Sequence, residues 1–193
     1  MKRPQTAFFR ALRVFAVILL FTLIAALPNF AFSQPQDSPP LHIHGDGIAL
    51  TDWTVDKIQK QFAAEITPIT YAGHSGSHIF KCVPLISLLK AAGVPTDLKM
   101  QPNSDPKTKS YSLRFVIAAR GRDGYVVAFS LAELIPAVGN RHVWLALDED
   151  GQPLSANDGP MRLLSPDDQK PARSVHELAD ITLIDASATT RPD

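Results

Sequence analysis

The pattern of apolar and polar residues divides this chain into many short strands and a few helices. Apolar and polar positions alternate at 41–44 and 111–117, which is typical of strands with one buried face. Short runs of mainly apolar residues predict further strands at 66–71, 79–83, 125–129, 144–147, 161–164 and 181–184. Sheet is therefore expected to predominate over helix.

Two helices are predicted from apolar spacing and from their end signals. Val55, Ile58 and Phe62 fall on one stripe, which predicts a helix over 54–62. A second helix is predicted over 84–93, because proline is tolerated in a first helical turn and glycine commonly closes a helix.

A third helix is predicted from a capping box. Ser130 can accept a hydrogen bond from the backbone of Glu133, whose side chain can reach back to Ser130. We expect this helix to continue to about Val138, with Gly139 and Asn140 ending it. The predicted order of elements gives a single mixed α+β domain in which sheet predominates.

Glycine and proline mark the connections between these elements. Turns or loops are predicted at 45–47, 73–78, 95–109, 120–124 and 167–173. One helical turn is expected at 174–178, just before the last strand.

The first 33 residues have the pattern of a secretory signal. Basic residues precede an uncharged apolar run over 14–27, and small residues stand at Ala31 and Ser33. The run is too short to span a bilayer comfortably, so we expect cleavage after Ser33 and a periplasmic or secreted mature protein. An uncleaved segment would instead anchor the protein, which is the one membrane association that the sequence predicts.

The rest of the chain divides into a spacer, a domain and a tail. Residues 34–40 are polar and rich in proline, as in mobile spacers. Residues 41–186 hold every predicted strand and helix. Residues 187–193 are small and polar, which predicts a disordered tail.

Charge and cysteine content narrow the classes of function. Of 19 basic and 19 acidic residues, four basic ones lie in 1–33, so the remainder carries 15 basic against 19 acidic residues. An acidic balance argues against nucleic-acid binding, which needs basic surface against phosphate. The single cysteine, Cys82, excludes an internal disulfide.

The stretch from 144 to 166 carries the most distinctive polar pattern. Between two apolar strands lie the acidic turn 148–151 and the elbow Asn157-Asp158-Gly159-Pro160, with Arg162 two residues beyond. Glycine and proline make such an elbow rigid, so Arg162 would be a fixed cation. The alternative is an ordinary turn in which Arg162 pairs with a nearby carboxylate.

Three segments resemble the molybdopterin-binding domain of the sulfite oxidase family. Residues 83–94 resemble its "G-x-P-L-x-x-L-L-x-x-A-G-V" segment, and 124–133 resemble the segment that follows. Residues 150–166 resemble its "N-G-x-P-L … G-x-P-x-R-L-v-x-P" hallmark. The three stand in the family's order and cover about 41–186, so the resemblance implies a mixed, β-rich fold of the sulfite oxidase type.

The resemblance also implies a molybdopterin cofactor, whose molybdenum the family holds through a cysteine thiolate. That cysteine would fall near Thr70, Tyr71 and Ala72, where this chain has none. Cys82 instead occupies the glycine position of the first segment. Cys82 is either a small buried hydrophobic residue or a displaced metal ligand at the start of a helix.

The residues with which the family binds its pterin have closer counterparts in this chain than the molybdenum-ligating cysteine has. Asn157 and Arg162 match the family's elbow, Arg173 and Ser174 resemble its basic and hydroxyl pair, and Lys170 lies nearby. A guanidinium fork suits phosphate oxygens, which agrees with a small anionic ligand or pterin as the partner. Alternatively, these residues form surface ion pairs with Asp158, Asp167 and Asp168.

Two histidine pairs offer a different chemistry. His42 and His44 share one face of a predicted strand, and His74 and His78 flank a glycine loop. Four imidazoles could hold zinc or copper, although solvated histidines would give the same pattern.

The sequence therefore predicts an exported, molybdopterin-dependent oxidoreductase-like protein that binds a pterin or another anion without the cysteine-ligated molybdenum centre. One alternative is an active molybdenum oxidoreductase in which Thr70, Tyr71 or Cys82 replaces the missing ligand and an unidentified redox partner supplies electrons. The other is a periplasmic metal-binding or interaction module that uses the histidine pairs.

Overall fold

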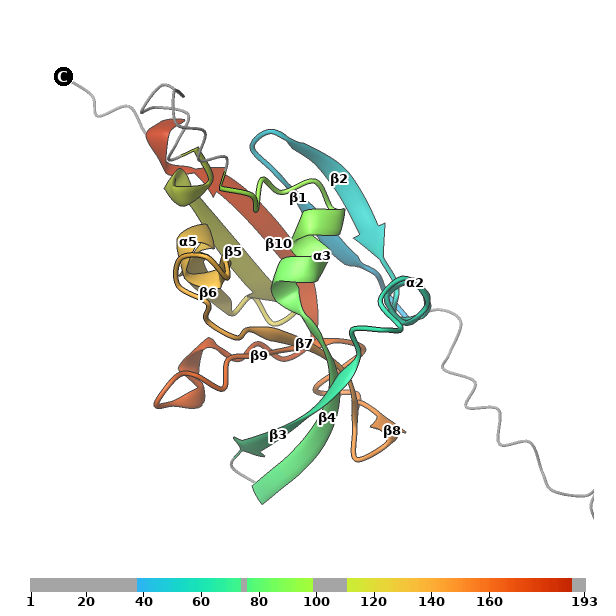
Figure 1. The fold of residues 1–193 in the computed structure, drawn as a ribbon. Coiled ribbons are helices and arrows are strands. Elements are labelled where there is room, and N and C mark those ends of the chain that lie inside the picture. The colour runs from blue at the N-terminus through green and yellow to red at the C-terminus, as the bar shows by residue number, and fades with distance from the viewer. Residues whose placement is uncertain (1–37, 74–75, 99–110, 189–193) are drawn as a thin grey trace, which may run out of the picture. The chain divides into compact units, whose positions relative to one another are not determined.

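Two β-sheets dominate the part of the chain that the structure describes. The computed structural model describes residues 38–73, 76–98 and 111–188. The two sheets share no strand, and each is built from segments that lie far apart in sequence (Figure 1).

The first sheet joins both ends of the domain. Its strand order is β2, β1, β10, β5, β6, with β2 at Ile48–Trp53, β1 at Leu41–Gly45, β10 at Leu178–Asp185, β5 at Phe115–Gly121 and β6 at Val126–Ser130. Strands β1 and β10 pair in parallel, and the other neighbours are antiparallel. The first and last strands therefore lie side by side at the centre of this sheet.

The second sheet carries the strands of the stretch from 144 to 166. Its order is β3, β4, β7, β8, with β3 at Thr67–Gly73, β4 at Gly76–Pro84, β7 at Trp144–Glu149 and β8 at Gln152–Pro153. Strand β9, Arg162–Leu164, also pairs with β7. The β3–β4 hairpin extends well beyond the first sheet (Figure 1).

The helices are short. They are α2 at Val55–Gln61, α3 at Leu85–Ala91, α5 at Leu131–Leu134, and the 3₁₀ turns η2 at Tyr111–Arg114, η3 at Pro171–Arg173 and η4 at Ala186–Ala188. Helix α3 lies over one face of the first sheet (Figure 1) and buries Leu85, Leu88 and Leu89 completely. These leucines follow the i, i+3, i+4 spacing of one helical face.

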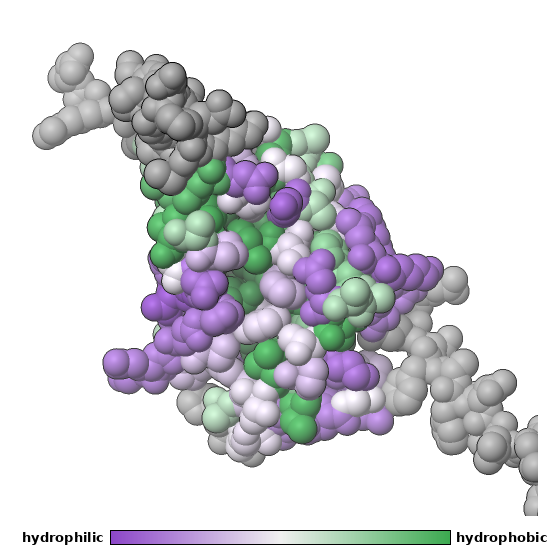
Figure 2. Space-filling model, viewed as in Figure 1, coloured by the Kyte–Doolittle hydropathy of each residue, from purple (hydrophilic) through white to green (hydrophobic). Residues whose placement is uncertain are grey.

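The main core gathers apolar residues of the first sheet, of helices α2, α3 and α5, and of one face of the second sheet. Ile43, Ile117 and Ile181 from neighbouring strands are fully buried in it. A second, smaller cluster lies on the second sheet and consists of Tyr71, Phe80, Cys82, Ala146 and Leu164. In the view of Figure 2, polar and apolar residues are interspersed on the surface.

The helix starts agree with the capping signals. The Thr54 side chain accepts a hydrogen bond from the backbone N–H of Lys57 at 3.2 Å, and α2 begins directly after it. Pro84 precedes α3 as predicted. The capping box of Ser130 and Glu133 is present at the start of α5.

The predicted end of the third helix was wrong. The α5 helix ends at Leu134 instead of near Val138, and Ile135 is extended with ψ at 122°. Pro136 explains the early end, because a residue before proline is disfavoured in the helical region.

The strand predicted over 111–117 was also partly wrong. Tyr111–Arg114 is the 3₁₀ turn η2, and the strand begins only at Phe115. Tertiary contacts favour the turn: Ser112 donates to the carbonyl of Asp97 at 3.1 Å, and Arg114 pairs with Asp185 at 2.6 Å.

Three segments hold more strand than the sequence predicts. No strand is predicted over Ile48–Trp53, where β2 lies, and the predicted helical turn at 174–178 is wrong, because β10 begins at Leu178. The predicted loop over 73–78 is largely strand, because Tyr71 and His78, and Gly73 and Gly76, are paired across the hairpin. Backbone pairing in a hairpin tolerates these glycines.

The prediction of a mixed α+β domain in which sheet predominates is confirmed. The described residues fall in one compact unit. The predicted signal segment 1–33, most of the spacer 34–40 and the last part of the tail lie outside the described residues. Among the residues described, none of the helices has the length and apolar character needed to cross a membrane.

Candidate functional site

One face of the second sheet brings together segments from three parts of the chain. Tyr71 on β3 is paired with His78 on β4, and Arg162 on β9 is paired with Ala146 on β7. Directly paired residues of antiparallel strands point to the same face, and so do alternate residues of one strand. Tyr71, His78 and Arg162 therefore border the small cluster around Phe80.

A buried hydrogen bond joins Tyr71 to Ser174. The Tyr71 hydroxyl lies 2.7 Å from Ser174 Oγ, and the backbone N–H of Ser165 donates to the same oxygen at 3.3 Å. Tyr71 and Ser174 are each only 6% exposed. Tyr71 stands where the family resemblance expects its cysteine, and Ser174 was predicted as a binding residue, so two predicted segments meet here.

Arg162 lies at the edge of this cluster with its side chain only 12% exposed. Its guanidinium carbon is 5.6 Å from the centre of the Phe80 ring and 6.0 Å from that of Tyr71, within cation–π range. Nη1 pairs with Asp158 Oδ1 at 3.1 Å. Nε is buried and has no hydrogen-bond partner among the described residues.

Asp158 holds the elbow in place. Its carboxylate accepts from Ser155 Oγ at 2.7 Å and contacts His176 Nδ1, and its carbonyl accepts from the backbone N–H of Glu177 at 3.0 Å. Burial alone would raise the pKa of Asp158, but the hydrogen bonds from Ser155 and His176 and the charge of Arg162 hold the pKa below its usual value. Arg162 is thus a fixed cation, but one paired with a carboxylate.

Arg173 does not join this site. Its Nε and Nη2 donate to the two oxygens of Asp168 at 2.9 and 2.7 Å, and Nη1 donates to Glu133 at 3.3 Å. Its guanidinium carbon is 4.5 Å from the centre of the Phe129 ring, a residue of the first sheet. Arg141 contacts the same two carboxylates. The predicted role of Arg173 as a ligand-binding residue is therefore unsupported, because its guanidinium group already donates hydrogen bonds to Asp168 and Glu133.

The other two predicted binding residues lie on the surface. Asn157 and Lys170 are both exposed, Asn157 in the elbow and Lys170 just before η3. Of the five predicted residues, Arg162 and Ser174 converge on Tyr71, Arg173 belongs to a separate ion-pair network, and these two remain on flanking loops. The alternative interpretation, pairing with Asp158 and Asp168, is confirmed for both arginines.

Cys82 has the character of a core residue. It is fully buried, and its thiol donates weakly to the carbonyl of Phe80 with an S–O distance of 3.6 Å. Burial raises the pKa of the Cys82 thiol to about 12, with a smaller contribution from Asp148. A thiol that stays protonated is a poor metal ligand, since the ligand is the thiolate.

The first histidine pair does not form a shared site in the described structure. His42 Nδ1 lies 2.7 Å from Asp52, and His44 Nε2 lies 2.8 Å from Asp180. Each imidazole thus contacts a carboxylate of its own. The second predicted pair is incomplete, because His74 lies outside the described residues.

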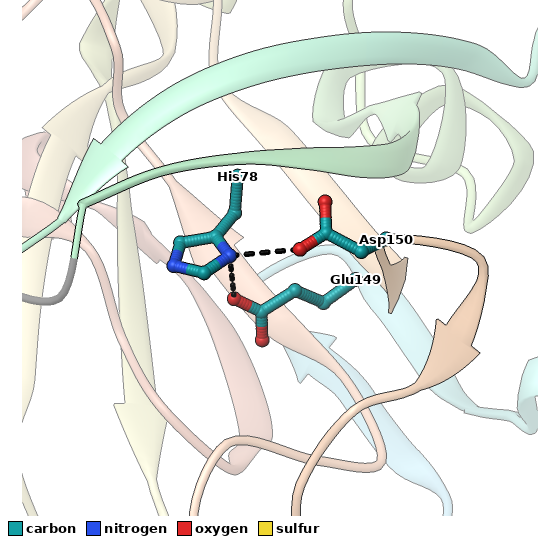
Figure 3. Close-up of side chains that lie close together, drawn as sticks. All are labelled: His78, Glu149 and Asp150. Carbon is teal, nitrogen blue, oxygen red and sulfur yellow. Dashed lines mark hydrogen bonds and ion pairs between the residues drawn. The ribbon is translucent and has the colours of Figure 1, made fainter.

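His78 belongs to a cluster that sequence reasoning missed. Its Nδ1 lies 2.8 Å from Asp150 Oδ2 and 3.3 Å from Glu149 Oε1, and Figure 3 shows both carboxylates turned toward the ring. The three ligand atoms all lie within 4.8 Å of one another. The acidic turn 148–151 had been noted only as a connection, and nothing in its spacing indicated that β4 would lie beside it.

The pKa values in this cluster follow from its charges. The hydrogen bond to Asp150 raises the pKa of His78; burial and Arg162 oppose that shift, and Glu149 adds to it. The pKa of Asp150 is lowered, first by the backbone N–H of Ile79 and then by His78. The cluster thus brings one imidazole nitrogen and two carboxylate oxygens close together.

Two kinds of chemistry are available on this face. A thiolate-held molybdenum does not fit, because Thr70 and Ala72 are exposed residues without a soft donor, Tyr71 bonds to Ser174, and Cys82 is buried as a thiol. An anion at Arg162 and a cation at His78 remain compatible with the side chains present. No family model matches this chain, and no curated protein matches it significantly.

Proposed function

We propose that this chain is an exported binding domain of the molybdopterin-dependent oxidoreductase type. In this proposal it binds a small anionic ligand, such as a pterin carrying a phosphate, and does not carry a cysteine-ligated molybdenum centre. The proposed contact surface is the edge of the second sheet around Tyr71, Arg162 and Ser174. Asn157 and Lys170 would contribute from the flanking loops.

One observation carries the proposal. Tyr71, Arg162 and Ser174 come from three parts of the chain that the family resemblance singles out: Tyr71 and Ser174 share a hydrogen bond of 2.7 Å, and the Arg162 guanidinium carbon lies 6.0 Å from the Tyr71 ring centre. Residues so far apart in sequence come together only through the tertiary fold. A binding domain needs its polar groups held in place by packing, and the rings of Tyr71 and Phe80 do this for Arg162.

Arg162 is suited to an anion despite its pairing with Asp158. Only Nη1 bonds to the aspartate, while Nε is buried without a hydrogen-bond partner among the described residues. A guanidinium has five N–H donors, so one carboxylate oxygen does not exhaust it. A phosphate oxygen could accept from the remaining donors, with Lys170 adding charge from the surface.

The catalytic alternative is less well supported by this geometry. An active oxidoreductase would need a substitute ligand for the metal, and neither Tyr71 nor Cys82 offers a free donor: the Tyr71 hydroxyl bonds to Ser174, and Cys82 is buried with the pKa of its thiol raised. The chain's own residues can bind and orient a ligand on this face.

The test is the content of the complete protein purified from its native host. We expect pterin fluorescence and phosphorus in the released ligand without stoichiometric molybdenum. Stoichiometric molybdenum would favour the active enzyme, and a protein free of both pterin and other bound anions would overturn the proposal. The readout does not depend on knowing the substrate.

A pair of variants assigns binding to Arg162. Arg162→Gln should lose retained ligand, whereas Arg114→Gln should retain it. Arg114 is a close match: it pairs with Asp185 at 2.6 Å, lies 4.2 Å from the Tyr111 ring centre, and also has a buried Nε without a described partner. Equal loss in both variants would show a general effect of removing a paired arginine, and would contradict the proposed site.

A further inference from the structure

The cluster of His78, Glu149 and Asp150 has a geometry that a simple ion pair does not require. One imidazole nitrogen faces two carboxylate oxygens, at 2.8 Å and 3.3 Å. A single N–H can donate well to only one of them. The two carboxylate oxygens are also held within 4.8 Å of each other, where like charges repel.

The backbone fixes this arrangement from both sides. The N–H of Asp150 donates to the carbonyl of Ile79 at 2.7 Å, and the N–H of Ile79 donates to Asp150 Oδ1 at 2.9 Å. These two bonds leave Oδ2 directed at His78, as Figure 3 shows. Asp150 adopts a positive φ of 50°, and the turn therefore presents its side chain toward β4.

We propose that His78, Glu149 and Asp150 form a binding site for a divalent first-row transition metal ion, with zinc as the representative ion. This inference is independent of the anion-binding function proposed above. Each residue contributes one atom: Nδ1 of the imidazole and one oxygen of each carboxylate. Three protein ligands leave at least one coordination position for water or an anion.

The distances agree with such a site. Ligand bonds of about 2.0–2.2 Å in a tetrahedral arrangement place the ligand atoms about 3.3 Å apart. The distance from Nδ1 to Glu149 already has this value, and the distance of 2.8 Å to Asp150 needs to widen by only a fraction of an ångström. A bound divalent ion would replace the shared proton and neutralise both carboxylates.

The donor set indicates the class of metal. One imidazole nitrogen with two carboxylate oxygens favours zinc, copper, nickel or iron, whereas magnesium and calcium prefer oxygen ligands alone. The His78 ring is 29% exposed, Glu149 24% and Asp150 54%, so solvent and ions can reach the three side chains. The positive charge of Arg162 acts on His78, so the site is not surrounded by acidic groups alone.

The test is a zinc titration of the complete 193-residue chain after removal of metals with a chelator. We expect one zinc ion per chain by isothermal titration calorimetry. Glu149→Gln, which keeps the side-chain shape, should weaken binding by at least about 10-fold, and His78→Ala should weaken it by at least about 100-fold. X-ray absorption at the zinc edge should show one imidazole and oxygen ligands.

His44→Ala is the matched control. His44 also contacts a carboxylate at 2.8 Å, but in the described structure it belongs to no group of three ligand residues. This variant should bind zinc as the unaltered chain does. If His44→Ala weakens binding as much as His78→Ala, or if His78→Ala binds zinc as tightly as the unaltered chain, the proposed site is overturned.

Thermal unfolding separates loss of the site from loss of the fold. Zinc should raise the midpoint of the unaltered chain and of His44→Ala, because a ligand that binds the folded state stabilises it. Metal-free Glu149→Gln should unfold near the midpoint of the unaltered chain, and the same zinc concentration should raise its midpoint by less. A zinc-dependent rise in Glu149→Gln equal to that of the unaltered chain would contradict the role of Glu149.

Discussion

The two sheets of this domain differ in what their buried faces contain. The first sheet and its helices enclose a continuous apolar core that includes Ile43, Leu88 and Ile117. The second sheet packs one face against this core through residues such as Val83 and Leu145, and its other face carries a small cluster of five buried residues, bordered by Arg162 and by the His78 cluster. The face that carries the small cluster is therefore the less extensively packed of the two.

The ion pairs follow the same division. Arg173 links the two regions, since its guanidinium lies over Phe129 of the first sheet while it bonds to Asp168 in the loop after β9. Arg162 stays on the second sheet and keeps donors beyond its bond to Asp158. The bonds of Arg173 to Asp168 and Glu133 tie segments of the fold together, whereas the remaining donors of Arg162 are those that the proposed ligand would use.

The largest expected effect is in the main core. Leu88→Ala removes a fully buried side chain from α3 and should lower the free energy of unfolding by about 2–5 kcal/mol. Leu164→Ala, at a fully buried position in the small cluster, should fall toward the lower end of that range, because fewer residues pack around it. Chemical denaturation of both variants measures the difference. Equal losses of stability would show that the small cluster is packed as extensively as the main core.

The network around Asp168 should have the next largest effect. Asp168→Asn weakens charged hydrogen bonds to Arg173 and Arg141, and we expect a loss of about 1.5–3 kcal/mol. The hydrogen bond from Arg173 lowers the pKa of Asp168 in the folded protein. The charged Asp168 carboxylate therefore stabilises the fold fully above the pKa of an unfolded aspartate, about 3.9, and this stabilisation is lost as the pH falls through the lower pKa of the folded protein.

Acid denaturation followed by circular dichroism tests whether the stabilisation by Asp168 decreases as the pH falls. The unaltered chain should lose stability relative to Asp168→Asn as the pH falls below about 4. A difference between the two proteins that stays constant down to pH 2 would show that the carboxylate of Asp168 does not stabilise the fold through its charge.

A smaller effect is expected at the hydrogen bond between Tyr71 and Ser174. Ser174→Ala leaves both the Tyr71 hydroxyl and the Ser165 N–H without this partner, and should cost about 1–3 kcal/mol. Tyr71→Phe removes one hydroxyl and leaves Ser174 bonded to Ser165, so it should cost about 0.5–1.5 kcal/mol. Thermal denaturation compares them. A larger loss for Tyr71→Phe would contradict the role of Ser174 as the shared hydrogen-bond partner.

The smallest expected effect concerns the ionisation of His78 in the metal-free chain. Its pKa is raised chiefly by Asp150, so the ion pair stabilises the fold fully below the unfolded histidine pKa of about 6.5 and is lost as pH rises through the folded pKa. NMR titration of the His78 ring should show a lower pKa in Asp150→Asn and a smaller decrease in Glu149→Gln. The reverse order would indicate that Glu149 is the main partner.

Local sequence signals predicted the elements that depend on neighbouring residues. The starts of α2, α3 and α5 follow from Thr54, Pro84 and Ser130, because caps act within one turn. Pro136 also indicates the end of α5, but the prediction of a helix to about Val138 did not take it into account. The failure at Tyr111–Arg114 has a different cause: Arg114 pairs with Asp185, which lies far away in sequence.

The candidate site was only partly predictable for the same reason. The elbow and Arg162 were apparent from the sequence, and so was the possibility that Asp158 pairs with it. The ion pairs of Arg173 include one with Glu133, which lies in a distant segment, and the His78 cluster depends on the pairing of β4 with β7. Neither could be derived from spacing along the chain.

The sequence by itself determined the sheet-rich α+β class, the helix starts and the rigid bend before Arg162, because hydrophobic periodicity and capping act over short distances. The tertiary structure decided which charges meet. An arginine in the sequence has a charge but no partner, and whether it binds a ligand or an aspartate depends on which strands pair. The imidazole of His78 and the carboxylates of Glu149 and Asp150 face one another only because the hairpin and the acidic turn lie on adjacent strands.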